Sequence, residues 1–212
     1  DDDTLEFVFT DNISFFDKII PSQIPHKGET LCRTAKYWFT LLESKGIKNH
    51  FIEYLPPNRM RVKRFQIIED YDKIDQTTND YLIPLEVICR HYAAGSLMDR
   101  VKAGKITAEQ LGFPKDHVVQ YGEKLPKPFL ECTTKLEAHD RELDEKEAKD
   151  IAGLSDSDYQ GILDTILKVD EIIGEEASKR KLIHCDGKKE FGYDENRNLM
   201  LIDTFGTLDE DR

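Results

Sequence analysis

Residues 83–96, IPLEVICRHYAAGS, decide the fold, because they join an alternating strand pattern to a run of small, turn-forming residues. Glu86 and Arg90 lie an even number of residues apart, so a strand places them on one face. Arg90 then leaves the strand beside residues 93–96, AAGS. A guanidinium next to a hydroxyl and backbone N–H groups suits a phosphate or a carboxylate. By spacing alone, pairing of the arginine with a structural carboxylate is the more common outcome.

A second informative stretch lies near the end of the chain, in residues 184–192, HCDGKKEFG. A strand points Asp186, Lys188 and Glu190 to one face, roughly 7 Å apart. Asp203 ends the expected hairpin partner and can lie close to that row. One ammonium among carboxylates is costly unless cations join it, and Mg²⁺ with phosphate ligands would resolve the imbalance. An exposed strand whose charges face water explains the pattern about equally well.

The third stretch is residues 9–29, FTDNISFFDKIIPSQIPHKGE. Asp11, Ser14 and Asp17 cluster after a predicted strand, and the Lys27-Gly28 pair begins a helix. Helix N-termini attract anions. A polar turn with an ordinary helix cap is the favoured local interpretation.

The rest of the chain mixes strands with helices. Strands are predicted over residues 5–10, 50–54, 60–68, 82–91, 129–134, 182–193 and 199–204, with a helix or turn near 107–111. Helices are predicted over residues 29–45, ended by Gly46, and after Ser155, where Asp158 completes a capping-box pattern. The second helix carries an apolar stripe that we interpret as core: Ile162, Leu163, Ile166, Leu167, Ile172 and Ile173.

This order of elements predicts an α+β fold with two lobes. The polar stretch 69–80, EDYDKIDQTTND, marks the boundary between them. Residues 1–68 would form a smaller, β-rich N-terminal lobe, and residues 69–212 a larger α+β lobe that carries the substrate and metal site.

Composition narrows the classes of function. The 212 residues carry a formal charge of −12, which argues against binding to long nucleic acids but not to small phosphorylated ligands. No apolar run approaches the ~20 residues needed to cross a bilayer, and the acidic start is unlike a secretory signal. The four cysteines are widely spaced and the histidines show no HxH or HExxH pattern, so the sequence predicts free thiols in a reducing cytosol and no zinc site.

Several familiar catalytic motifs are absent from the sequence. It contains no GxxxxGK[ST] loop, no GxGxxG after a strand and no GxSxG elbow. The HRD and DFG segments of protein kinases are missing as well. Nucleotide chemistry, if present, must therefore rest on another arrangement.

The stretches described above resemble the SAICAR synthetase (phosphoribosylaminoimidazole-succinocarboxamide synthase) family. One signature of that family, PLEVxxRxxxxGS, is matched by residues 84–87 with Arg90, Gly95 and Ser96, and the other, DxKxEFG, by residues 186–192. The early DxISxxD, the KG pair and residues 203–212 also fit, so the resemblance spans essentially the whole chain. It implies a two-lobed α+β fold with antiparallel sheets, distantly like ATP-grasp enzymes and protein kinases, with ATP in the interlobe cleft.

The resemblance also implies a reaction. An ATP-dependent ligase of de novo purine biosynthesis would join L-aspartate to the carboxylate of 5-aminoimidazole-4-carboxylate ribonucleotide, giving SAICAR, ADP and phosphate through an acyl phosphate. Mg²⁺ would accompany ATP, and the transfer would rest on positioning and charge stabilisation. The enzyme would be cytoplasmic, with no nucleic acid or membrane as partner, and the sequence leaves a homo-oligomer open.

Site residues follow from the same resemblance, position by position. Lys188 and Asp186 would be catalytic and line the reacting carboxylate. Glu190 and Asp203 would hold Mg²⁺ with the ATP phosphates. The substrates would be held by Arg90, Ser96 and Arg212 at the ribonucleotide 5′-phosphate and by Lys135 and Asp140 from a substrate loop. Residues 61–65, with Lys63, would meet the adenine of ATP and Glu86 its ribose, while Lys27 and Ser14 are weaker assignments.

The sequence departs from the family pattern at its ends. Family members begin with a glycine-rich GKxK-type segment over the ATP phosphates and usually continue beyond the position of Arg212, and Leu208 stands where proline is common. We therefore expect segments to be missing from this sequence. Two other hypotheses remain open: another ATP-dependent carboxylate-activating or kinase-like enzyme, and an acidic binding module with a degenerate nucleotide site. The intact set of Asp186, Lys188, Glu190 and Arg90 speaks against the module.

Overall fold

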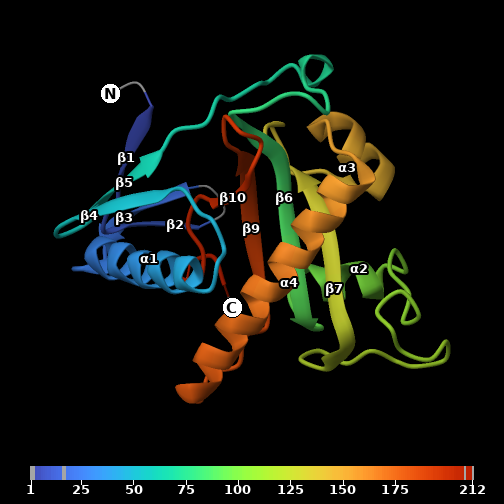
Figure 1. Ribbon diagram of the computed structural model, residues 1–212. Coiled ribbons are helices and arrows are strands. Elements are labelled where there is room, and N and C mark those ends of the chain that lie inside the picture. Colours follow the sequence, from blue (N-terminus) through green and yellow to red (C-terminus); the bar gives the residue numbers. More distant parts are fainter. Residues whose placement is uncertain (1–2, 16–17, 208, 212) are drawn as a thin grey trace.

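The structure, a computed structural model, describes residues 3–15, 18–207 and 209–211. Two antiparallel sheets and a hairpin organise these residues (Figure 1). A three-stranded sheet has the order β1 (Thr4–Val8), β5 (Arg59–Lys63), β4 (Phe51–Leu55), and β2 (Asn12–Phe15) pairs with β3 (Lys18–Gln23). A five-stranded sheet has the order β10 (Leu199–Ile202), β9 (Asp186–Tyr193), β6 (Tyr81–Tyr92), β7 (Lys124–Thr134), β8 (Glu142–Leu143).

Helices cover both sheets. They are α1 (Lys27–Ser44), α2 (Ser96–Lys102), α3 (Glu145–Ala152) and α4 (Asp156–Lys179), with the short 3₁₀ helix η1 (Tyr71–Lys73) in the long loop before β6. In Figure 1, α4 runs across one face of the five-stranded sheet and α1 lies beside the three-stranded sheet. Antiparallel sheets combined with helices confirm the predicted α+β class.

A single apolar core joins the two sheets. It extends from Phe39 of α1 and Met60 of β5 to Leu85 of β6 and Ile166 of α4, all fully or almost fully buried. Strands within the first 68 residues form the three-stranded sheet, and later strands form the five-stranded sheet. The division into two lobes stays a prediction, because the two segments share this core.

The end of the chain packs against its beginning. The indole Nε1 of Trp38 donates to the carbonyl of Gly206 at 2.7 Å, and the rings of Phe39 and Phe205 meet edge to face at 4.8 Å. The backbone N–H of His50 donates to the carbonyl of Leu201 at 3.1 Å. Residues 201–206 therefore complete the environment of α1 and β4.

Helix α4 begins as predicted and buries a slightly different stripe. The Ser155 hydroxyl accepts from the Asp158 N–H at 3.1 Å, and the Asp158 carboxylate accepts from the Ser155 N–H at 3.0 Å, which confirms the capping box. Leu167 is exposed, so its assignment to the core was wrong, and Asp170 is buried instead. At 3.6 residues per turn, residue 170 follows residue 166 on the core face, whereas residue 167 points away.

The start of α1 differs from the ordinary cap that the local pattern favoured, because its N-cap residue His26 has φ +66° and makes no side-chain capping bond. The Asp11 carboxylate accepts from the backbone N–H of Gly28 at 2.9 Å and from that of His26 at 3.1 Å. A Cβ at Gly28 would lie 2.5 Å from the carbonyl oxygen of Phe9, so only glycine fits this contact. Close packing against Phe9 thus explains why glycine stands at position 28.

Some boundaries differ from the predictions. Residues 60–68 form a strand only to Lys63, and the strand predicted from residue 182 begins at Asp186. Helix α2 begins directly after Gly95, whose φ is +55°, while residues 107–111 form turns. Among the described residues no helix is both long enough and apolar enough to cross a membrane.

Candidate active site

The predicted site residues of β6 and β9 lie side by side on the sheet face turned away from α4. The antiparallel register sets Glu86 opposite Glu190 and Arg90 opposite Asp186. The alternation of each strand then sends its other residues, such as Val87 and Cys89, into the core beneath α4. Two stretches that lie a hundred residues apart in sequence thus form one continuous polar row.

Two lysines stand between the facing glutamates. Lys188 Nζ lies 2.6 Å from Glu86 Oε1 and 3.7 Å from Glu190 Oε1, and Lys135 Nζ lies 2.5 Å from Glu190 Oε2. Like charges directly opposite on neighbouring strands repel, so these ammonium groups offset that repulsion. Burial lowers the pKa of Lys188, but the hydrogen bond and charge of Glu86 outweigh it, and the pKa is raised overall. Lys188 therefore stays charged at neutral pH.

Carboxylates outnumber cations at the end of the row where Glu190 lies. Burial and then the charge of Asp203 raise the pKa of Glu190 from 4.5 to about 7. The same two causes raise the pKa of Glu210. Within the described chain, the buried Oε1 of Glu190 has no hydrogen-bond partner. The two raised pKa values indicate a place where a cation would be stabilised.

Arg90 sits at the other end of the row, beside Ser96 as predicted. Its Nη2 donates to the Ser96 hydroxyl at 3.3 Å. Its Nε also donates to Glu131 at 2.6 Å and its Nη1 to Asp186 at 3.3 Å. The carboxylate pairing that spacing alone favours is therefore present together with the contact to the Gly-Ser turn.

The structure adds two charged residues that the sequence analysis missed. Glu131 of β7 bridges Arg90 to Arg100 of α2, whose Nη2 lies 2.5 Å from Glu131 Oε2. The signal was weak: Glu131 lies at an alternating position of a predicted strand, and Arg100 follows Ser96 by one helical turn. Only the fold shows that β7 and α2 meet Arg90.

The other predicted site residues are placed less centrally. Lys63 pairs with Glu195 at 2.5 Å and lies in a separate pocket with Arg64, Gln66 and Asp80. Asp140 is exposed in the loop after β7. Ser14 is exposed on β2, Lys27 pairs with Asp209 at 2.6 Å, and Arg212 lies outside the described residues. Their assignments stay predictions.

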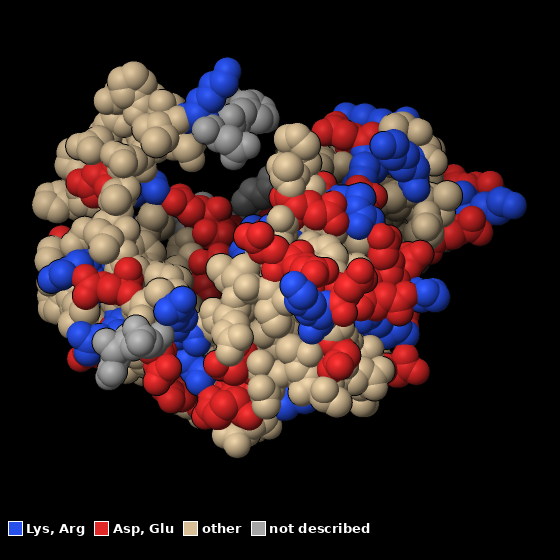
Figure 2. Space-filling view, turned by 90° about the horizontal axis from the view of Figure 1, so that it is seen from above, with Lys and Arg blue, Asp and Glu red and all other residues tan. Residues whose placement is uncertain are grey.

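The carboxylates and Arg90 of the row are buried, and Lys188 is partly exposed. Figure 2 shows a hollow between the two halves of the structure, with carboxylate side chains prominent along it. A cleft lined by acidic residues suits ligands that arrive with cations, either metal ions or neighbouring ammonium groups. The geometry thus favours a metal-assisted phosphate chemistry over direct capture of a bare anion.

Comparison with known proteins agrees with this geometry. A family model described as SAICAR synthetase matches residues 1–212. Phosphoribosylaminoimidazole-succinocarboxamide synthase of Thermoplasma volcanium is 50% identical over 212 residues, which are 100% of this chain and 70% of that protein. A solved SAICAR synthetase in complex with ADP has a TM-score of 0.74 at 31% identity, over 96% of this chain and 74% of that one. The SAICAR synthase of Saccharomyces cerevisiae complexed with SAICAR has a TM-score of 0.78 at 26% identity, over 100% of this chain and 70% of that one.

Fold, site and similarity together define a carbon–nitrogen ligase. The chain belongs to the SAICAR synthetase family. The predicted function, ATP-dependent ligation of aspartate in purine biosynthesis, is thereby confirmed.

Proposed function

We propose that the polar row on β6 and β9 is the place where ATP phosphorylates the imidazole carboxylate and where L-aspartate then attacks. The observation that carries this proposal is Lys188, a charged and partly exposed ammonium held between Glu86 and Glu190. A fixed cation stabilises the negative charge that shifts between oxygens during phosphoryl transfer. The ADP and SAICAR complexes of the similar structures support these ligands for this chain.

Mg²⁺ fits the carboxylates of Glu190 and Asp203. Both offer hard oxygen donors, the ligands that Mg²⁺ prefers. The buried Oε1 of Glu190, which accepts no hydrogen bond within the described part of the chain, and the raised pKa of its carboxyl are the features that a divalent cation would relieve. When bound, Mg²⁺ supplies charge neutralisation for the ATP phosphates.

Other residues bind and orient the reactants in this proposal. Arg90 and Ser96 hold the ribonucleotide phosphate, with Arg212 joining them, and Asp186, which lines the reacting carboxylate with Lys188 in this proposal, also pairs with Arg90 from the strand opposite. Lys135, already at Glu190, and Asp140 approach from the loop after β7. Glu86 and Lys63 serve the ribose and adenine ends of ATP.

The assay that tests the function measures ADP release. The purified protein, Mg²⁺, ATP and the aminoimidazole carboxylate ribonucleotide are incubated with and without L-aspartate. We expect sustained ADP release and formation of the succinocarboxamide only when aspartate is present. Aspartate-independent turnover on a different carboxylate acceptor would favour the alternative carboxylate-activating enzyme.

Mg²⁺ binding is expected to depend on pH near neutrality. Glu190 is protonated below its pKa of about 7, so Mg²⁺ must displace a proton there. The apparent affinity for Mg²⁺ should therefore fall by about tenfold for each pH unit below 7. Between pH 4.5 and about 7, the folded metal-free protein keeps a proton on Glu190 that the unfolded chain loses. Its free energy of unfolding therefore falls as the pH rises through this range. Calorimetric titration of Mg²⁺ with ADP on both sides of pH 7 measures the slope.

The control for this titration is Glu190→Gln, which cannot ionise. We expect this variant to bind Mg²⁺ weakly at every pH and to unfold at a higher temperature than the wild type above pH 7. A wild-type affinity that does not change across neutral pH would remove Glu190 from the metal site.

Arg90→Lys is expected to raise the KM for the ribonucleotide by about tenfold, because lysine keeps the charge and loses the planar fork. The KM values for ATP and aspartate should change little, since Arg90 lies at the end of the row away from Glu190. Lysine can still face Glu131 and Asp186, so the fold is retained. Arg33→Lys, at an exposed pair with Glu29 on α1, is the matched control. An unchanged KM for the ribonucleotide would assign Arg90 to the structural carboxylates alone.

A further inference from the structure

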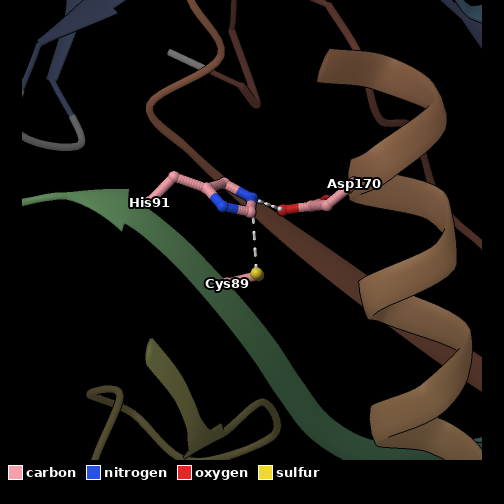
Figure 3. Close-up of side chains that lie close together, drawn as sticks. All are labelled: Cys89, His91 and Asp170. Atoms are coloured by element: carbon pink, nitrogen blue, oxygen red, sulfur yellow. Dashed lines mark hydrogen bonds and ion pairs between the residues drawn. The ribbon is translucent and has the colours of Figure 1, made fainter. Parts of the chain in front are cut away.

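A second polar cluster lies on the opposite face of β6 and β9, beneath α4. We call it the α4 cluster; its members are Cys89, His91, Asp170, His184, Lys189 and Asp211. The proposed reaction uses none of them. Figure 3 shows Cys89 and His91 projecting from β6 toward Asp170 on α4.

Three of these side chains present metal-binding atoms at tetrahedral spacing. Cys89 Sγ lies 3.6 Å from His91 Nε2, which lies 3.3 Å from Asp170 Oδ2. The three donor atoms all lie within 4.8 Å of one another. Around a tetrahedral Zn²⁺, the sulfur–nitrogen edge would be about 3.6 Å and the nitrogen–oxygen edge about 3.4 Å, given the usual bond lengths. The two measured contacts therefore match the edges of such a site.

Hydrogen bonds already connect these groups. His91 Nε2 lies within hydrogen-bond reach of both the Cys89 thiol and the Asp170 carboxylate. A metal ion would take the place of these hydrogen bonds, because all three atoms can offer lone pairs to it.

His184 is a further donor aimed at the same carboxylate. Its side chain is only 4% exposed, and its Nε2 lies 3.2 Å from Asp170 Oδ2 and 3.8 Å from Asp211 Oδ1. Nevertheless, this buried nitrogen makes no hydrogen bond within the described chain. A buried imidazole nitrogen without a partner is costly, and a metal ion beside Asp170 would satisfy it.

The carboxylates of the α4 cluster outnumber its ammonium group, which favours binding of a cation. Lys189 Nζ lies 2.7 Å from Asp211 Oδ1 and 3.4 Å from Asp170 Oδ1, and all three side chains are almost fully buried. Two carboxylates and one ammonium leave one negative charge in excess unless a histidine carries a proton, and such an excess is costly in a buried place. Zn²⁺ with a Cys89 thiolate brings the total to zero.

We propose that Cys89, His91 and Asp170 bind one Zn²⁺, and that His184 holds the Asp170 carboxylate in place from its other side. Sulfur and imidazole ligands favour Zn²⁺ over Mg²⁺. On binding, the S–H bond of Cys89 breaks, a Zn–S bond forms and the proton passes to solvent. His91 is 24% exposed and borders a groove with Pro128, Leu167 and Lys168, which gives the ion a path of entry. The sequence analysis predicted no zinc site, and no spacing pattern links these residues, because Cys89 and His91 come from β6 and Asp170 from α4.

Cobalt titration of the chelator-treated protein tests the proposal. Co²⁺ replaces Zn²⁺ in tetrahedral sites and shows sulfur-to-metal charge transfer in the near ultraviolet when a thiolate is bound. We expect one equivalent of Co²⁺ to produce this band with strong visible absorption, and one equivalent of Zn²⁺ to abolish both. Absence of the band in the folded wild type would overturn the proposal and leave the α4 cluster as a metal-free set of ion pairs.

Matched variants locate the ion. Cys89→Ala should lose the charge-transfer band, whereas Cys132→Ala, at another buried thiol, should retain it. Glu190→Gln should also retain it, which separates this site from the proposed Mg²⁺ site; loss of the band there would overturn the proposal. His91→Asn, at the partly exposed edge, and His184→Gln should each weaken Co²⁺ binding by about tenfold or more. These two variants keep the test valid if Cys89→Ala does not fold, and wild-type affinity in both would also overturn it.

Discussion

Replacing Lys188 by methionine is expected to lower kcat by a factor of about 10²–10³ while the protein stays folded. The Lys188 ammonium is held between Glu86 and Glu190, and its raised pKa keeps it charged, so it acts as a fixed charge and not as a base. Its side chain is 33% exposed, and Lys135 remains at Glu190. Glu190 can also take up a proton near neutral pH, which limits the repulsion that the substitution leaves behind. The melting temperature should therefore change little.

The comparison requires kcat from ADP release and a melting temperature from calorimetry on the same preparation. Lys146→Met is the control, because Lys146 is exposed on α3 and pairs with Asp150 one helical turn away. We expect wild-type values of both quantities for this control. Wild-type kcat in Lys188→Met would refute the role given to Lys188.

The same substitution at the next residue, Lys189, should lower the stability of the protein. Lys189→Met is expected to lower the free energy of unfolding by about 3–5 kcal/mol, because it leaves buried Asp170 and Asp211 without their cation. Burial lowers the pKa of Lys189, but the charges of the two aspartates outweigh it and raise the pKa overall, so a charged side chain is lost. At about 2–4 °C per kcal/mol for a chain of this size, the melting temperature should fall by roughly 10 °C.

This measurement is made on chelator-treated protein, so that no metal ion compensates for the lost ammonium. Lys188→Met serves as the matched control, since the two lysines are neighbours on opposite faces of β9. Adding Asp170→Asn to Lys189→Met should restore part of the stability, because one unpaired charge is removed. A loss of stability no larger than that of Lys188→Met would show that the buried ion pairs contribute little.

The local elements were predictable from the sequence where a short pattern determines them. Alternation located β6 and β9, and the Ser155 and Asp158 pair located the start of α4. The register that sets Glu86 opposite Glu190 was not predictable, because it depends on pairing between strands a hundred residues apart. Alternation also places Lys189 on the core face, but its partners Asp170 and Asp211 come from elements that only the fold brings together.

The candidate site was likewise predictable within a single strand but not between elements. The pattern predicted that Asp186, Lys188 and Glu190 share a face, and the structure brings them beside Glu86 and Arg90. It did not predict that Lys135 pairs with Glu190 or that Glu131 bridges two arginines, because both contacts are set by the packing of β7 and the loop after it. Motif resemblance supplied roles for residues, while geometry supplied their partners.

The contacts of residues 201–206 with Trp38, Phe39 and His50 have a consequence for biosynthesis. A ribosome delivers the N-terminal segment first, yet α1 and β4 obtain some of their hydrogen bonds and ring contacts from residues made more than 150 positions later. The nascent chain therefore holds Phe39 without the ring of Phe205 until that residue has been made. Contacts across such long sequence separations are slow to form, so the newly made N-terminal third exposes apolar surface that favours aggregation until these residues arrive.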